Sequence, residues 1–231
     1  MGRLPRPIAD GLVYHALNRG NNREAVFSAD ADFAAFLHAL RQTRQRYPFR
    51  LYGYCLMSNH FHLLLQPESE QNISRILQSL TVAHTWRFHK AHGSVGHVWQ
   101  GRFKSPVIQD DDHLLTVLRY IESNPMRAGL VSDVQQYPWC SYPVHGLGQG
   151  DELVTQLPGW HTLGQTERAR QARWRRFVHT PLTERELAAV RRAVTSGRPF
   201  GSPGWVEATA RSLGLALMPR PRGRPRKQTE K

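Results

Sequence analysis

Two histidines separated by one residue form the clearest candidate site for chemistry in this sequence. His60 and His62 lie in a segment, residues 59–65, that is otherwise rich in Phe and Leu. Side chains alternate across a β-strand, so both imidazoles are expected on one face of a sheet. Neutral imidazole nitrogen is a common ligand of divalent metals. The spacing therefore predicts either a metal site or two structural histidines on a half-exposed strand.

A tyrosine and an asparagine four positions apart form the second candidate set. Tyr120 and Asn124 follow an apolar repeat that predicts a helix starting after residue 111. Positions four apart share a helix face, so both side chains are expected to point together toward a neighbouring site. Pro125 disfavours helical geometry at the residue before it, which places Asn124 at the helix end. Alternatively, Tyr120 lies at a helix edge and Asn124 is a polar residue that ends the helix.

The elements that must position these residues follow from the apolar periodicity. It predicts strands over residues 12–18, 49–57, 60–66 and 103–109. Helices are expected over 31–47, with Asp30 as N-cap, and over 72–92, ended by Gly93. Ser58-Asn59 fits a hairpin turn. The order predicts an α+β fold, a ferredoxin-like antiparallel sheet with helices on one face and an added tyrosine-bearing helix.

The C-terminal third has a different character, with basic helical segments expected over 167–177 and over 184–195, the latter capped by Thr183. We therefore expect a catalytic domain over residues 1–145 and a helical, basic extension over 146–218. Residues 219–231 are rich in Arg and Pro and predict a disordered basic tail.

Composition narrows the class of partner. The chain of 231 residues has 31 Lys and Arg against 18 Asp and Glu, a formal charge of +13, which favours a polyanion such as nucleic acid. No long apolar run predicts a membrane span or a signal peptide, so a cytoplasmic, nucleoid-associated protein is expected. The two cysteines, Cys55 and Cys140, form neither a disulfide framework nor a zinc cluster. No phosphate-binding loop of the Walker type occurs.

Several residues are candidates for DNA contact. Arg19 and Arg102 stand beside glycines after strand segments and can bind phosphate or guanine, or are ordinary surface arginines. Trp99 can stack on an unpaired base or belong to the core. In the tail, Arg222 and Arg224 lie in an Arg-Gly-Arg-Pro run that can enter a narrow minor groove, or simply remain solvated.

Five stretches together resemble a known family, the HUH single-tyrosine transposases, and within it the REP-associated tyrosine transposases. They are Tyr-His-Ala-Leu-Asn-Arg-Gly at 14–20, the block 57–65, Gly-His-Val-Trp-Gln-Gly-Arg-Phe at 96–103, Tyr-Ile-Glu-Ser-Asn-Pro-Met-Arg-Ala at 120–128, and Arg-Gly-Arg-Pro at 222–225. The resemblance implies that His60 and His62 bind Mg²⁺ or Mn²⁺ and that Tyr120 is the nucleophile. It places Asn124 where the third metal ligand stands, a glutamine in some relatives, and Arg127 among the DNA-contacting residues.

The resemblance also implies an activity and a partner. Tyr120 would attack single-stranded DNA beside hairpins formed by repeated palindromes, and the resulting 5′-phosphotyrosine could be rejoined to a 3′-OH. Such an enzyme needs no nucleotide cofactor, and a monomer is favoured over a dimer. Two alternatives remain open: a domesticated protein that binds DNA hairpins without cutting, and a metal-dependent phosphodiesterase that uses water in place of tyrosine.

Overall fold

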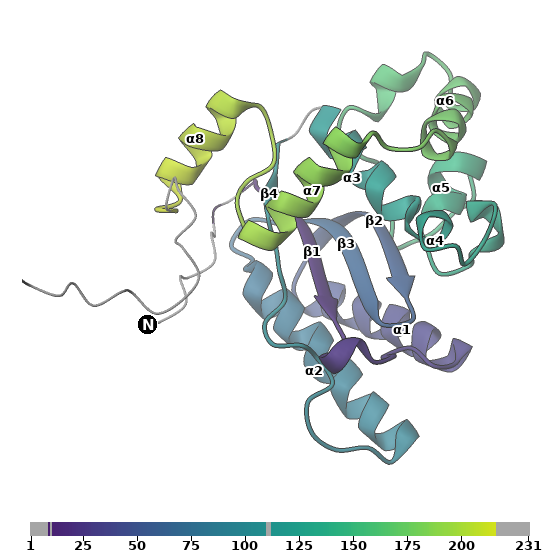
Figure 1. The fold of residues 1–231 in the computed structure, drawn as a ribbon, viewed down its shortest axis with the longest axis vertical. Helices are drawn as coiled ribbons and strands as arrows, with labels where there is room; N and C mark the ends of the chain where they lie inside the picture. The colour runs from purple at the N-terminus through teal and green to yellow at the C-terminus, as the bar shows by residue number, and fades with distance from the viewer. Residues whose placement is uncertain (1–8, 10, 110–111, 216–231) are drawn as a thin grey trace, which may run out of the picture.

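A four-stranded antiparallel sheet forms the centre of the molecule (Figure 1). The computed structural model describes residues 9, 11–109 and 112–215. The strands run in the order β2-β3-β1-β4, and their bounds are Val13–Arg19 for β1, Phe49–Met57 for β2, His60–Pro67 for β3 and Val107–Ile108 for β4. This order and the helices around it confirm the predicted ferredoxin-like α+β fold.

The strand register determines which residues share a face of the sheet. The β2–β3 hairpin pairs Met57 with His60 across the two-residue turn at 58–59, as predicted. On the other side of β3, Leu17 of β1 lies opposite His62 and Arg19 lies opposite His60. Residues that are directly opposite in an antiparallel pair project to the same face. Both histidines therefore share their face with the odd-numbered residues of β1.

The fourth strand is much shorter than predicted. The pattern predicts a strand over residues 103–109, but only Val107–Ile108 form β4, with an isolated bridge between Leu17 and Lys104. Pro106 interrupts the ladder because proline has no amide hydrogen to donate. Its carbonyl still accepts a hydrogen bond from the His15 amide at 3.0 Å.

Two long helices cover one face of the sheet. They are α1 (Asp30–Arg46) and α2 (Ile73–His92), and their apolar side chains share a core with Phe61, Leu63 and Leu65 of β3. Gly93 ends α2 in the left-handed conformation at φ 59°, as predicted.

The N-terminal cap of α1 differs from the prediction. Asp30 is the first residue of the helix, not its cap. Instead, the Asp32 carboxylate accepts hydrogen bonds from the Ser28 and Ala29 amides at 2.8 and 3.1 Å.

The tyrosine-bearing helix α3 (Asp112–Glu122) packs on the opposite face of the sheet, where Leu114, Val117, Leu118 and Ile121 are fully buried. Gly53 of β2 permits this close approach, since a Cβ at that position would lie 2.3 Å from Cδ1 of Leu118. A side chain there would push α3, and Tyr120 with it, away from the sheet.

The C-terminal half consists of short helices around α3. They are α4 (Asn124–Arg127), α5 (Tyr142–Leu147), α6 (Glu167–His179), α7 (Glu184–Ser196) and α8 (Pro203–Ser212), with the 3-10 turns η2 (Val134–Gln136) and η3 (Trp160–Leu163). A further 3-10 turn, η1 (Asn21–Arg23), follows β1 in the N-terminal half. Helices α6 and α7 lie where the sequence predicts them, and Thr183 caps α7 through its hydroxyl, which accepts the Glu186 amide at 3.2 Å. In Figure 1, α7 crosses in front of the sheet beside α3. The division at residue 145 stays a prediction.

A buried carboxylate joins α3 to this half of the chain. Glu122 is fully buried, and its Oε1 accepts hydrogen bonds from Ser141 Oγ at 2.6 Å and His145 Nδ1 at 2.7 Å. Its Oε2 accepts from Trp174 Nε1 at 2.8 Å. Three donors from α5, α6 and the residue before α5 thus satisfy this buried carboxyl group at the end of α3.

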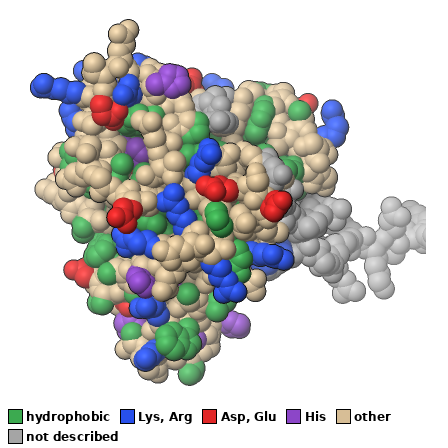
Figure 2. Space-filling model, turned by 180° about the vertical axis from the view of Figure 1, so that it is seen from behind, with side chains coloured by type: hydrophobic (Ala, Val, Ile, Leu, Met, Phe, Trp, Pro, Cys, Tyr) green, Lys and Arg blue, Asp and Glu red, His purple; other side chains and the backbone are tan. Residues whose placement is uncertain are grey.

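The surface opposite the α3 side carries mixed charge. Figure 2 shows Lys and Arg side chains interspersed there with acidic, hydrophobic and neutral ones, not gathered into one patch. None of the helices that the structure describes is long and apolar enough to cross a bilayer.

Candidate active site

The two histidines of β3 lie side by side on the α3 face of the sheet. His62 is 3% exposed and His60 is half-buried, and their ring centroids are 4.9 Å apart. Their intervening neighbour, Phe61, is fully buried on the other face among the residues of α1 and α2. The predicted division of this strand between a polar pair and an apolar face is therefore confirmed.

Tyr120 meets these histidines from α3, although almost sixty residues separate them in the chain. Its ring centroid is 5.8 Å from that of His62, and the side chain is 9% exposed. Tyr120, His60 and His62 line one cavity of about 560 Å³. The phenol and the two imidazoles thus share one cavity, on one side of the sheet.

A third histidine belongs to this cluster and escaped the sequence prediction. His15 of β1 is fully buried, and its Nε2 lies 2.8 Å from Nδ1 of His62. Its ring centroid is also 5.9 Å from that of Tyr120. Alternation along residues 12–18 puts His15 on one face with Leu17 and Arg19, but only the pairing of β1 with β3 brings it to His62.

Burial keeps all three imidazoles neutral at neutral pH. Desolvation lowers the pKa of His15 to about 3 and that of His60 to about 4. The pKa of His62 falls well below its usual value for the same reason, and its two histidine neighbours lower it further. A neutral imidazole is the form that binds a metal.

The hydrogen bonds of the two β3 histidines leave one ring nitrogen of each available. His60 Nδ1 donates to the Asn59 side-chain oxygen at 2.6 Å, and His62 Nδ1 is held by His15. Neither Nε2 atom has a hydrogen-bond partner among the described residues. Metal-binding histidines characteristically engage the second nitrogen in this way. The donor pair therefore fits a divalent cation at the Nε2 atoms.

A third donor is not in place beside them. Asn124 is 7% exposed and does not line the cavity; its Oδ1 accepts a hydrogen bond from Arg127 Nη2 at 2.6 Å. The Asn124 Nδ2 atom is buried without a partner. Within the described part of the chain, no three His, Cys, Asp or Glu side chains cluster as a metal site. Asn124 Oδ1 is therefore bound to Arg127 in this structure, away from the cavity that the histidines line.

Arg127 contacts the predicted nucleophile as well. Its guanidinium carbon lies 4.1 Å from the centroid of the Tyr120 ring, and Nη1 donates to the Tyr120 carbonyl at 3.2 Å. One arginine thus holds Tyr120 and Asn124 together. Its predicted role as a DNA contact stays a prediction.

Two of the other predicted DNA-binding residues surround the cavity. Arg19 and Arg102 are exposed and line it, and Arg19 donates from Nε and Nη2 to Gln100 Oε1 at 3.1 and 2.9 Å. Trp99 lies elsewhere: it is half-buried against Phe61, and its indole nitrogen donates to the Thr81 carbonyl at 3.2 Å. The tail residues Arg222 and Arg224 lie outside the described residues.

The extension also contributes to the cavity. Val194 of α7 lines it, on the same helix whose Leu187, Val190 and Ala193 are buried. No local signal in the sequence indicates this, because Val194 reaches the cavity only through the packing of α7 on α3.

Comparisons with known proteins agree with this geometry. The family described as Transposase IS200 like matches residues 9–124, just over half of the 231-residue chain. A Haemophilus influenzae protein described as a REP-associated tyrosine transposase is 32% identical over 117 residues, which cover 46% of this chain and 66% of that protein, slightly less than two thirds. The REP-associated tyrosine transposase of Escherichia coli is 22% identical over 136 residues, covering 58% of this chain and 78% of that one.

A solved structure supports the fold. A REP-associated tyrosine transposase bound to a REP hairpin has a TM-score of 0.54 at 20% identity, covering 68% of this chain and 99% of its own. The family match and these relatives confirm the resemblance to tyrosine transposases that the sequence motifs indicate. This chain belongs to the IS200-like transposase family.

Proposed function

We propose that this protein cleaves single-stranded DNA beside hairpins of repeated palindromes and rejoins it, with Tyr120 as the nucleophile. The observation that carries the proposal is the single cavity that Tyr120, His60 and His62 line together. The relatives support it: two are described as REP-associated tyrosine transposases, and a solved structure that is similar in fold contains a REP hairpin.

The chemistry would be an in-line exchange at one phosphodiester. The Tyr120 oxygen loses its proton and bonds to phosphorus while the bond to the 3′ oxygen breaks, and that oxygen takes up a proton. The products are a 5′-phosphotyrosine and a free 3′-OH. A 3′-OH can reverse the step, because one phosphodiester replaces another; no nucleotide cofactor is needed.

His60 and His62 would hold a divalent cation, Mg²⁺ or Mn²⁺, that neutralises charge on the phosphate when bound. His15 would position His62: if Nδ1 of His62 donates its proton to Nε2 of His15, the lone pair of His62 Nε2 faces the cavity. Asn124 would complete the site when Arg127 turns to the phosphate, to which guanidinium binds strongly.

The cavity's basic rim supports a DNA strand as substrate. Arg19, Arg102 and Lys104 line it beside the histidines, and all three are exposed. We propose Arg19 and Arg102 as phosphate contacts, with Trp99 and the tail arginines Arg222 and Arg224 as contacts outside the cavity. Action as a monomer and association with the nucleoid are part of the same proposal.

Covalent capture tests the proposal. Full-length protein is incubated with Mn²⁺ and a labelled oligonucleotide that carries a hairpin and a 5′ single-stranded extension, and the products are separated on a denaturing gel. A protein–DNA adduct is expected for the wild type and for Tyr47→Phe, a control tyrosine at the end of α1. Tyr120→Phe should form none.

The same gel separates the alternatives. Hairpin binding without any cleavage would indicate a non-cutting DNA-binding protein. Cleavage without an adduct would indicate hydrolysis by water. An adduct that survives Tyr120→Phe would show that another residue is the nucleophile.

A further inference from the structure

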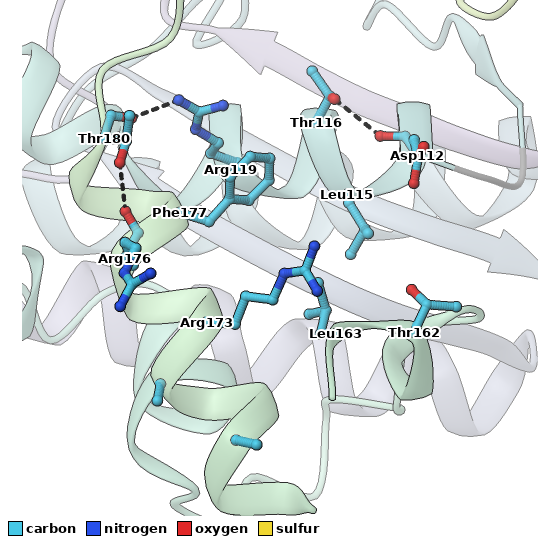
Figure 3. Close-up of a pocket in the computed structure, with 12 residues that line it drawn as sticks. Asp112, Leu115, Thr116, Arg119, Thr162, Leu163, Arg173, Arg176, Phe177 and Thr180 are labelled. Atoms are coloured by element: carbon cyan, nitrogen blue, oxygen red, sulfur yellow. Dashed lines mark hydrogen bonds between the residues drawn. The ribbon is translucent and has the colours of Figure 1, made fainter. Parts of the chain in front are cut away.

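A second and larger cavity lies in the C-terminal half, away from the histidines. It has a volume of about 1000 Å³ and lies between α3, η3 and α6 (Figure 3). The match to the IS200-like family ends at residue 124, so two of its three walls belong to the extension. Its size falls within the range of sites that bind small organic ligands.

The walls of this cavity are mainly apolar and rigid. Leu115 of α3 and Leu163 of η3 are each 7% exposed, and Phe177 of α6 is half-buried between them and Arg119. The Arg119 guanidinium stacks 4.2 Å from the Phe177 ring and donates to the Thr180 and Pro181 carbonyls at 2.6 and 2.8 Å. Arg119 is thus a fixed part of the wall.

Two further arginines of α6 remain available. Arg173 and Arg176 line the cavity, are exposed, and make no side-chain hydrogen bond or ion pair with the described residues. Figure 3 shows the Arg173 side chain extending from α6 toward Leu115 and Leu163. An acidic side chain, Asp112, lies at the rim and is exposed. Guanidinium groups above an apolar cleft suit a ligand that joins a flat apolar body to an anion.

We propose that this cavity binds a phosphorylated nucleoside, presented as an unpaired nucleotide of the DNA strand that the protein processes. The base would lie between Leu115, Leu163 and Phe177, and the flanking phosphates would pair with Arg173 and Arg176. Asp112 can accept a hydrogen bond from a base amino group. The basic C-terminal tail is a poor occupant because its charge repels these arginines. This assignment rests on the proposed DNA-processing function.

Equilibrium binding of oligonucleotides tests the proposal. The full chain with Tyr120→Phe avoids covalent capture, and anisotropy of a labelled hairpin with a single-stranded extension reports the affinity. Adding Arg173→Ala and Arg176→Ala should weaken binding about tenfold and reduce the slope of log K against log salt by about 1.4, that is, about 0.7 for each lost contact on single strands. Arg168→Ala, on the same helix but outside the cavity, is the matched control.

A filling variant tests the cavity without changing its charge. Ala172 lines the cavity, so Ala172→Tyr should weaken binding of the extended hairpin, whereas Ala188→Tyr, at an exposed site of α7, should not. A blunt hairpin without unpaired nucleotides should bind all of these variants alike. Deoxyadenosine monophosphate at micromolar concentration should not compete.

Three outcomes would overturn the assignment. If the double-arginine variant and the Arg168→Ala control bind the extended hairpin with equal affinity, Arg173 and Arg176 do not contact its phosphates. If Ala172→Tyr leaves the affinity for the extended hairpin unchanged, no base enters the cavity. Tight competition by the free mononucleotide would identify a nucleotide site independent of the strand. The adduct assay with intact Tyr120 is a separate measurement, so a failure here leaves the proposed cleavage untouched. A failure of the proposed cleavage would instead appear as a missing adduct, with the affinity differences between these variants unchanged.

Discussion

Both faces of the central sheet bury histidine, but among the described residues only the α3 face joins its histidines to a tyrosine in one cavity. On the α3 face, His62 contacts both His60 and His15, and His60 and His62 line a cavity together with Tyr120. On the other face, His84 of α2 is 2% exposed among Phe27, Phe36 and other rings, and its Nε2 donates to the Val26 carbonyl at 2.9 Å.

The contrast shows that burial and a depressed pKa do not identify a catalytic histidine. Burial lowers the pKa of His84 to about 4, the same value as for His60. What differs is the surroundings of the second nitrogen: His60 Nδ1 is bound and the residue lines a cavity, whereas the Nδ1 of His84 is buried without a partner. A free nitrogen beside a cavity is therefore the more useful criterion.

Removing a β3 histidine should give the largest effect on chemistry. We expect His62→Ala to weaken Mn²⁺ binding by more than about 100-fold, since it deletes a direct ligand. Calorimetric titration of the full chain measures this without DNA, and the adduct assay should show a parallel loss. Tight binding of Mn²⁺ by His62→Ala would show that the cation binds elsewhere. The histidines of the α3 face would then differ from His84 in no functional respect.

Replacing His15 should have a smaller effect of the same kind. His15→Ala removes the partner of His62 Nδ1, and the loss of such a positioning residue costs about 10- to 100-fold in metal affinity. His15→Gln should recover most of this, because its side-chain oxygen can accept the same hydrogen bond. If the alanine and glutamine proteins bind Mn²⁺ alike, His15 only fills space.

Replacing His84 should leave the chemistry intact and change stability alone. Its pKa is lowered from 6.5 to about 4, so the unfolded chain takes up the proton first as the pH falls. The corresponding stabilisation is present above pH 6.5 and is lost between pH 6.5 and about 4. At about 1.36 kcal/mol per pKa unit, it amounts to about 3 kcal/mol.

Urea unfolding at pH 7 and pH 4.5 checks this value. His84→Gln should show a shallower pH dependence than the wild type, with adduct formation at neutral pH within about twofold. A large loss of adduct formation at neutral pH, in a protein that remains folded, would mean that the aromatic face contributes to catalysis after all.

The sequence predicts the sheet side of the site well. The alternation around His60 and His62 and the two-residue turn before them are local properties, so β3 and its faces follow directly. The length of the fourth strand does not, because Pro106 allows only Val107–Ile108 to join the ladder.

The meeting of these side chains at one cavity does not follow from any local sequence pattern. Tyr120 reaches His62 only because Gly53 lets α3 approach the sheet, and Val194 enters the cavity through helix packing. The hydrogen bond from Arg127 to Asn124 depends on the break between α3 and α4, which Pro125 suggests without specifying the side-chain contact. Periodicity describes each element, whereas these contacts depend on how the elements meet.

The Glu122 carboxylate has a consequence for recombination between relatives. Its three donors come from residues 141, 145 and 174, all later in the chain than the region matched by the family. A chimera that joined the half of this chain up to residue 124 to a foreign C-terminal half would leave the Glu122 carboxyl group buried without its donors. A buried polar group left without a partner typically costs about 1–3 kcal/mol, and more if it is charged. Exchange of C-terminal halves among such transposases would therefore have to include the segment that carries Glu122, so that the carboxyl group and its three donors stay together.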